Sequence, residues 1–241
     1  MARNDLCPDA VAYHGQLAGD WERRYRKRSF QARVAVLEEC CRGRTLRGNW
    51  LDAGCGSGFL SRWLAQRGCR VTGVDAAPEM VEVSMNLAAA DANCERLSFR
   101  QVETIARLPF AAEEFSGILC SSVLEYLPDP QACLLEFFRV LKPAGLLLVS
   151  VPNVLSVVRQ AQIVCHRLGK TFGQSWVKFL DYSLNQYRAP EFADVLQSCG
   201  FSPAAPLPFG GPLPAAIQRR KWGGPLLMFA AEKNVPGAIS R

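Results

Sequence analysis

One segment decides the fold of this 241-residue chain: Leu51-Asp52-Ala53-Gly54-Cys55-Gly56-Ser57-Gly58. It belongs to an apolar run that starts at Asn49, and a helical pattern that ends at Gly68 follows it, which predicts a strand, a tight turn and a helix. Glycines in such a turn let a ligand approach bare backbone N–H groups. The spacing is Gly-x-Gly-x-Gly, and Phe59 stands where a dinucleotide-binding turn needs its third glycine. A nicotinamide oxidoreductase is therefore disfavoured.

The alternation of strand and helix continues along the chain. Further strands are predicted over 70–74, 97–102, 117–123, 145–151 and 226–232. Helices are predicted from Pro78, from Pro130 and over 190–199, and the proline-rich stretch 202–222 is typical of loops before the last strand. This order predicts an α/β fold with a mostly parallel sheet, helices on both faces, and a ligand at the carboxyl ends of the strands.

Asp75 ends the second predicted strand, 17 residues beyond Gly58. A carboxylate at this place can accept hydrogen bonds from both hydroxyls of a ribose. A strand-end turn would explain Asp75 by itself, but the glycine turn beside it favours a ligand that contains a nucleoside.

These residues resemble the class I S-adenosylmethionine-dependent methyltransferases. The resemblance covers about 50–153 and continues, in the family's order, through Leu108-Pro109-Phe110, Leu124-Glu125-Tyr126-Leu127-Pro128-Asp129-Pro130, Arg139-Val140-Leu141-Lys142-Pro143-Ala144-Gly145 and Ser150-Val151-Pro152-Asn153. It implies a Rossmann-like single domain with a seven-stranded sheet. We expect an N-terminal helical cap over 1–46, a cofactor-binding core over 47–152, a substrate-side insertion over 153–188, and a C-terminal helix with the last strands over 189–235.

The resemblance also implies which residues bind S-adenosylmethionine, the methyl donor that becomes S-adenosylhomocysteine. Gly54, Gly56 and Gly58 would pass its methionine end, Asp75 would hold the ribose, and Ser121 would face the sulfonium. The remaining expected contacts are Arg33 to the carboxylate, Glu103, Thr104 and Ile105 along the adenine, and Asp52, Cys55, Ala76 and Met80 beside the turn. Many relatives carry an acid where this chain has Thr104, four residues before Leu108, and here the acid is one place earlier at Glu103.

Within the class, the chain looks most like the ubiquinone-pathway O-methyltransferases that act on polyprenylated catechols. The expected reaction is methylation of a small hydrophobic aromatic or quinol-type hydroxyl. Alternatives are N-, C- or carboxyl-methylation of a specialised metabolite and, outside enzymes, a module that binds the cofactor without turnover.

Methyl transfer from a sulfonium needs alignment rather than a covalent nucleophile, but a phenol must lose a proton to a base. Histidine suits this role, and the chain has only His14 and His166. The relatives' usual Glu-His pair is Glu125-Tyr126 here, so these two residues complete the catalytic candidates. The ten cysteines show no Cys-x-x-Cys pair and the histidines no ligand spacing, so we expect no metal and a reducing compartment.

Net charge and hydropathy bear on partners and location. The charge of +6 gathers over 23–28 and 219–221, which favours solvated faces, and no nucleic-acid-binding signature accompanies it. We expect a cytoplasmic protein, monomer or homodimer, without a signal peptide over the first residues or a spanning helix. The basic, amphipathic stretch 153–170 is a candidate for peripheral contact with an anionic membrane.

Overall fold

The structure, a computed structural model, describes residues 8–235. The sequence-based expectations for residues 1–7 lie outside this range. The helices are α1 (Pro8–Gln16), α2 (Ala18–Arg24), α3 (Arg28–Cys40), α4 (Phe59–Ala65), α5 (Pro78–Ala89), α6 (Pro130–Val140), α7 (Val157–Thr171), α8 (Ala189–Ser198), α9 (Ala215–Gln218) and three 3-10 turns, η1 (Cys94–Arg96), η2 (Leu124–Tyr126) and η3 (Lys178–Asp181). The strands are β1 (Asn49–Ala53), β2 (Arg70–Asp75), β3 (Leu97–Gln101), β4 (Phe115–Ser121), β5 (Leu141–Pro152), β6 (Phe201–Pro203), β7 (Leu207–Phe209) and β8 (Leu226–Lys233).

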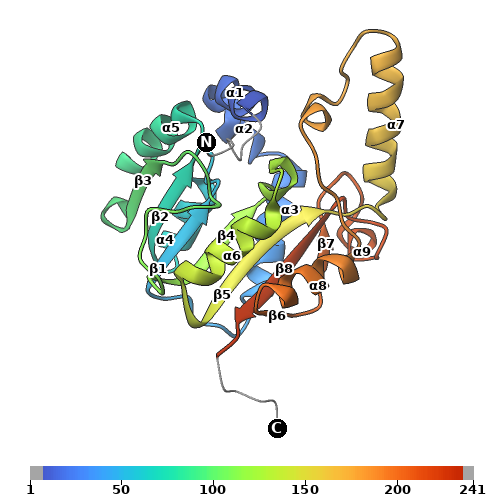
Figure 1. The fold of residues 1–241 in the computed structure, drawn as a ribbon. Coiled ribbons are helices and arrows are strands. Elements are labelled where there is room, and N and C mark those ends of the chain that lie inside the picture. The colour runs from blue at the N-terminus through green and yellow to red at the C-terminus, as the bar shows by residue number, and fades with distance from the viewer. Residues whose placement is uncertain (1–7, 236–241) are drawn as a thin grey trace, which may run out of the picture.

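The strands form one sheet in the order β3-β2-β1-β4-β5-β8-β6 (Figure 1). The first five are parallel to their neighbours, and β8 runs antiparallel between β5 and β6. This confirms the α/β fold with a mostly parallel sheet. Within the described range the sheet has eight strands rather than seven, because β7, which lies in the proline-rich stretch expected to form loops, pairs with β8 off this path.

Parallel pairing brings the functional turns together. In the register of β1, Leu51 lies opposite Thr72 of β2 and Ile118 of β4. Ala53, Asp75 and Ser121 therefore end neighbouring strands at one edge of the sheet, where parallel α/β sheets bind ligands.

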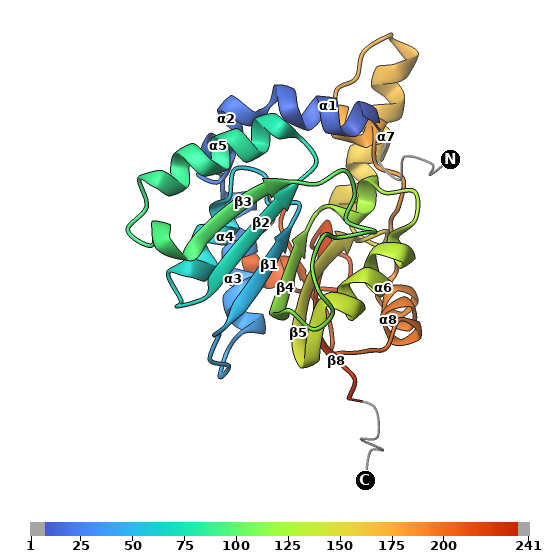
Figure 2. The same ribbon diagram turned by 60° about the vertical axis from the view of Figure 1, so that its left-hand side comes forward.

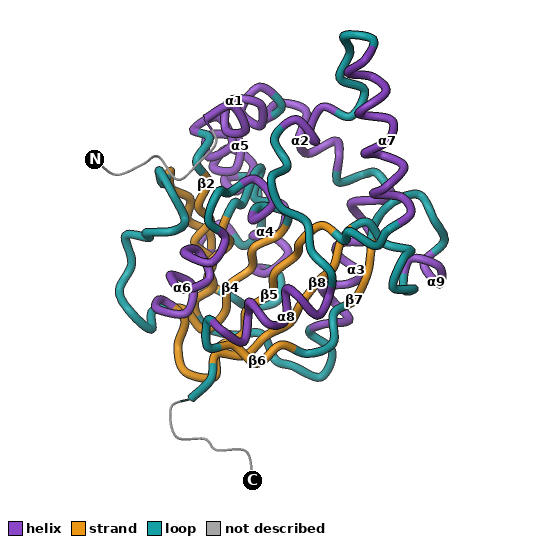
Figure 3. Tube along the Cα trace, turned by 45° about the vertical axis from the view of Figure 1, so that its right-hand side comes forward, coloured by secondary structure: helices purple, strands orange, loops and turns teal. Residues whose placement is uncertain are grey.

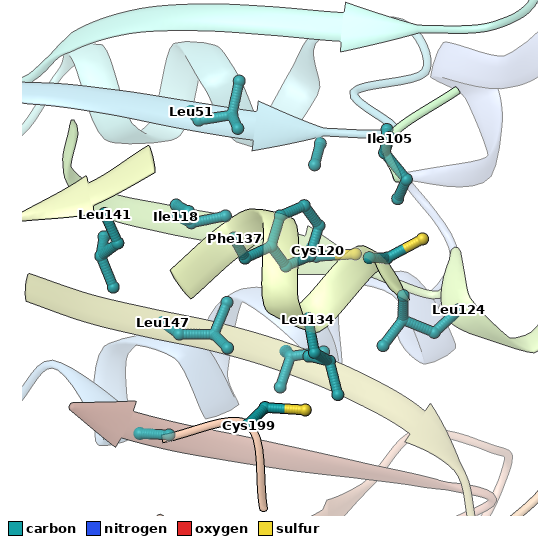
Figure 4. Packing of buried hydrophobic residues seen from close by; sticks show 14 of the residues in the cluster. Leu51, Ile105, Ile118, Cys120, Leu124, Leu134, Phe137, Leu141, Leu147 and Cys199 are labelled. Carbon is teal, nitrogen blue, oxygen red and sulfur yellow. The ribbon is translucent and has the colours of Figure 1, made fainter. Parts of the chain in front are cut away.

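Side chains alternate between two apolar layers, one on each face of the sheet. Leu51 and Ile118 point to the layer with Phe137 of α6 and Leu134, which Figure 4 shows at close range. Trp50 and Leu119, one residue along the same strands, join the opposite layer with residues of α3 and α4. Burial on both faces explains why these strands are almost continuously apolar.

Two parts stand over the carboxyl edge of the sheet. Helices α1 and α2 lie against α5 (Figure 2), and α7 projects from the molecule with the segment that returns to η3 (Figures 1 and 3). None of the helices within 8–235 is both long and apolar enough to cross a bilayer. Six of the cysteines within 8–235 are buried, as their apolar surroundings in the sequence predict.

Candidate functional site

A cavity of about 390 Å³ opens at the carboxyl ends of β1, β2 and β4, beneath α1, α2 and the first turns of α7. Most of the residues expected to bind a cofactor line it: Arg33, Gly54, Cys55, Gly56, Asp75, Ala76, Met80, Thr104, Ile105 and Ser121. Three of the four expected catalytic residues also line it: His14, Glu125 and Tyr126. The chain therefore gathers one set of predicted residues around one space.

The glycine turn needs glycine for reasons of space as well as conformation. Gly54 has φ +76°, and a Cβ there would lie 2.2 Å from the Val123 Cγ2. Gly56 has φ +53°, and its Cβ would lie 3.0 Å from the indole nitrogen of Trp21. Left-handed backbone is costly for other residues. The turn therefore leaves its main chain open to a ligand in the cavity.

Asp75 fastens this turn. Its carboxylate accepts hydrogen bonds from the backbone N–H of Gly56 at 2.9 Å and of Ala77 at 3.0 Å. Burial raises the pKa of the Asp75 carboxyl above its usual value, and these two hydrogen bonds oppose the rise. One carboxylate thus connects the glycine turn to the start of α5 at the wall of the cavity.

Four expected residues lie outside the lining of the cavity. Asp52 is buried and accepts a hydrogen bond from the Ser61 hydroxyl at 2.6 Å, so it braces α4 against β1. Burial raises the pKa of Asp52 to about 7, although the Ser61 hydrogen bond opposes this. Gly58, with φ +72°, precedes the first residue of α4, and a Cβ there would lie 2.8 Å from the Phe99 ring.

Glu103 and His166 are the other two expected residues that lie outside the lining of the cavity. Glu103 is exposed, because the chain leaves β3 so that Thr104 and Ile105 face the cavity instead. His166 lies on α7 with its Nε2 3.6 Å from the Asp181 carboxylate. The insertion folds back on itself there, so His166 faces η3 and not the cavity.

Arg33 reaches the cavity from α3. It is 8% exposed, and its Nη2 donates a hydrogen bond to the Ser122 hydroxyl at 2.8 Å. Its Nε is buried without an acceptor among the described residues. Ser122, which the sequence analysis missed, has φ +59° and its N–H donates to the Ser150 hydroxyl. Arg33 therefore presents an unpaired charged donor beside the end of β4.

His14 is oriented by a bond within its own helix. Its Nδ1 lies 2.7 Å from the backbone carbonyl of Ala10, and a carbonyl only accepts, so Nδ1 carries the proton. Nε2 keeps its lone pair and has no partner within the described chain. Burial lowers the pKa of His14 below its ordinary value, and the Asp75 charge opposes that shift. A neutral imidazole that can accept a proton thus lines the cavity.

Aromatic rings surround this imidazole. The His14 ring centroid lies 4.9 Å from that of Tyr126 and 5.5 Å from that of Trp21, both edge to face. Tyr13 stacks on Tyr182 at 5.0 Å, which joins α1 to the segment after η3. This wall suits a flat, apolar ligand.

Arg159 and Glu125 form a buried pair that the sequence did not reveal. They are 4% and 3% exposed, and Arg159 Nη2 donates to a Glu125 carboxylate oxygen at 3.3 Å and to the Ser183 hydroxyl at 2.7 Å. Burial raises the pKa of Glu125, and the guanidinium opposes the rise. Arg159 lies in the basic, amphipathic stretch 153–170, and its side chain is buried instead of exposed. The pattern gave no signal for it, because its partners lie 34 and 24 residues away.

Residues 51–149 match the family model described as "Methyltransferase domain". Over this range, which is less than half of the chain, the sequence resembles that family. A ubiquinone biosynthesis O-methyltransferase of Pseudomonas fluorescens (strain Pf0-1) is 36% identical over 104 residues, which are 43% of this chain and 44% of the relative. A protein of the same name from Coxiella burnetii (strain Dugway 5J108-111) is 38% identical over 111 residues, 45% of this chain and 46% of the relative. The alignments span less than half of these curated relatives.

Solved structures share the fold over a larger part of the chain. A chain of the complex between the Haloferax volcanii Trm112 methyltransferase activator and a protein inferred to be a methyltransferase superposes with a TM-score of 0.69, covering 98% of this chain and 100% of that one at 20% identity. At this identity the likeness establishes the Rossmann-like methyltransferase fold and nothing about the substrate.

Proposed function

We propose that this protein is an S-adenosylmethionine-dependent methyltransferase that transfers the methyl group to a hydroxyl of a small hydrophobic aromatic or quinol-type acceptor. One observation carries the proposal: the open glycine turn and Asp75 share a single cavity with the free Nε2 of His14. The matching family model and the names of the relatives support the same reaction class. We call the lining formed by Gly54, Gly56, Asp75 and Arg33 the cofactor end, and that formed by His14, Tyr126, Glu125, Arg159 and Phe179 the acceptor end.

The residues present at the cofactor end fit this cofactor. Side chains at Gly54 and Gly56 would press on Val123 and Trp21, which also line the cavity, and would disturb the space that the methionine end requires. Asp75 would accept from the ribose hydroxyls, and the unpaired Nε of Arg33 would meet the carboxylate. Thr104 and Ile105 would lie along the adenine, with Glu103 outside the contact. When bound, the cofactor supplies an electrophilic methyl group on a sulfonium.

The chain's own groups would then position and activate the acceptor. The apolar wall excludes water and holds an aromatic ring flat, so that a hydroxyl is aligned for in-line attack. We assign the proton to His14 Nε2, because His14 lines the cavity and its Nδ1 is fixed by the Ala10 carbonyl. Tyr126, in ring contact with His14, would help to orient the acceptor oxygen.

Turnover of methyl-labelled S-adenosylmethionine with a panel of catechols, hydroquinones and amines tests the function. Label is expected in the ether products of catechols or hydroquinones. Label in amine products alone would replace the O-methylation by N-methylation. Binding of the cofactor with no transfer to any extract component would favour the non-catalytic module.

We also propose that the projecting end of the insertion touches an anionic membrane. Its apolar side chains are exposed although they are large, among them Val164 and Leu168 of α7 and then Phe172, which is 72% exposed. Arg167 and Lys170 lie on the same exposed stretch. Such a surface suits a peripheral protein with a poorly soluble acceptor.

Sedimentation with phosphatidylglycerol-containing vesicles tests this contact. Leu168→Asp is expected to weaken sedimentation several-fold. Leu135→Asp on α6 is the matched control, because both leucines are 50% exposed. Equal binding of the two variants would remove the proposed membrane contact.

A further inference from the structure

Two arginines are buried in the wall of the same cavity. Arg33 is 8% and Arg159 is 4% exposed, and in each the Nε is buried without an acceptor. A buried donor that lacks a partner destabilises the fold, and more so when the group is charged. Both side chains therefore place a positive charge and an unused donor in the wall of the cavity.

The hydrogen bonds of Arg159 use only one of the three nitrogens of its guanidinium. Nη2 donates to Glu125 and Ser183, while Nε is buried without an acceptor among the residues described. The Phe179 ring lies 5.4 Å from the guanidinium carbon, and Phe179 also lines the cavity. Packing against this ring on one side and the hydrogen bonds at Nη2 hold the guanidinium plane in place.

The proposed cofactor can satisfy only one of these arginines. S-adenosylmethionine has a single carboxylate, and Arg33, bonded to Ser122 at the end of β4, stands at the cofactor end. Arg159 stands at the other end, bonded to Glu125 of η2. Glu125 contacts Arg159 through one carboxylate oxygen at 3.3 Å, so this pair uses few of the N–H donors of the guanidinium.

We infer that Arg159 binds a carboxylate on the ring of the methyl acceptor, so that the preferred acceptor is a hydroxylated aromatic acid. A positively charged guanidinium with an unused N–H donor pairs better with a carboxylate than with a neutral hydroxyl. This inference rests on the proposed function. Arg159 acts here as a specificity-determining residue, and its bond to the insertion ties acceptor recognition to the position of α7.

The test compares two probes that differ only in the carboxylate, 3,4-dihydroxybenzoate and catechol. Their affinities for the protein saturated with S-adenosylhomocysteine are measured by calorimetry. The wild-type protein is expected to bind the carboxylated probe about 10- to 100-fold more tightly, as a charge-assisted pair predicts. Equal affinity, or preference for catechol, overturns the inference.

Arg159→Gln is expected to abolish this preference, and Arg167→Gln, the same change on the exposed face of the same helix, to keep it. Glu125→Gln removes the nearby negative charge and is expected to increase the preference. If Arg159→Gln and Glu125→Gln weaken both probes equally, the pair is a structural clamp and the inference fails. Arg159→Lys keeps the positive charge and loses the planar guanidinium. If Arg159→Gln does not fold, the lysine variant replaces it in the test and is expected to retain a reduced preference for the carboxylated probe.

The affinity of S-adenosylhomocysteine itself, measured first, separates the two levels of the account. Its failure to bind the wild-type protein would refute the proposed function. Normal binding with no preference between the probes would refute only the role of Arg159.

Discussion

The cofactor end and the acceptor end of the cavity differ in what they are made of. The cofactor end is built largely from backbone at strand termini, with Gly54 and Gly56 held by one carboxylate from the neighbouring strand. The acceptor end is built from side chains that distant segments deliver, such as His14 of α1 and Arg159 of α7. A backbone cradle is specified locally, whereas a side-chain wall depends on how separate helices dock. The first should therefore fix the cofactor class and the second the acceptor.

The largest effect is expected at the acceptor end, from His14→Ala. Loss of a general base should lower kcat by about 10²–10⁴-fold while the affinity for S-adenosylhomocysteine stays within twofold. His166→Ala is the companion variant, since that residue faces Asp181, and its kcat should remain near the wild-type value.

The pH profile sharpens the same assignment. The pKa of His14 is lowered, so the base is already unprotonated near neutrality and kcat should be flat above about pH 6.5. Activity should decline only on further acidification. If His166→Ala lowers kcat and His14→Ala does not, the catalytic base is His166 in the insertion and not His14.

Asp52→Asn tests the brace beneath the cofactor end. The folded-state pKa of about 7 lies above the usual 3.8, so the stability that Asp52 contributes is complete below pH 4 and is lost as the pH rises towards 7. The loss amounts to at most roughly 4 kcal/mol at about 1.36 kcal/mol per pKa unit. Asparagine can still accept the Ser61 hydrogen bond without carrying a charge.

Urea unfolding at pH 4.5 and at pH 7.5 measures this difference. The wild-type protein should lose stability relative to Asp52→Asn between the two pH values. A parallel change in both proteins would show that Asp52 is ionised at little cost in the fold.

Asp75→Ala should weaken binding of S-adenosylhomocysteine about 100-fold, because the two hydrogen bonds that the ribose hydroxyls would donate to this carboxylate are lost. The same variant frees the Gly56 N–H that the carboxylate now holds. Asp91→Ala, at another turn carboxylate that caps Asn93, is the control and should leave the affinity unchanged. Equal affinities of the two variants would contradict the ribose assignment.

Gly54→Ala should give the smallest effect, measured as the change in the free energy of unfolding after the cost of alanine in left-handed backbone is subtracted. Gly43 has the same φ of +76° and open space around it, so Gly43→Ala measures that cost alone. The clash with Val123 should make Gly54→Ala less stable than Gly43→Ala by about 1–3 kcal/mol in chemical denaturation. Matching stabilities would show that the turn is looser than its contacts imply.

The sequence was sufficient where the structure is local. The strand, the glycine turn, Asp75 and the parallel sheet follow from patterns within a few residues. Cys55, Ala76 and Met80 are close in sequence to the glycine turn or to Asp75, and they line the cavity beside them. The prediction failed where burial depends on docking. His166 turns to Asp181 and Arg159 turns inward, because α7 and η3 fold on each other and no periodicity in α7 distinguishes its buried cation from its exposed ones.

Small geometric details account for the other differences. Glu103 and Thr104 are adjacent, and the exit of the chain from β3 decides which of them meets the cavity. Strand β7 follows Pro206 and contains Pro208, and only its pairing with β8 makes this segment a strand.

Isothermal calorimetry with S-adenosylhomocysteine and, separately, with NAD and NADP addresses the main claim most directly. The structure predicts stoichiometric binding of S-adenosylhomocysteine and no heat from either dinucleotide. Binding of a dinucleotide together with indifference to S-adenosylhomocysteine would contradict it.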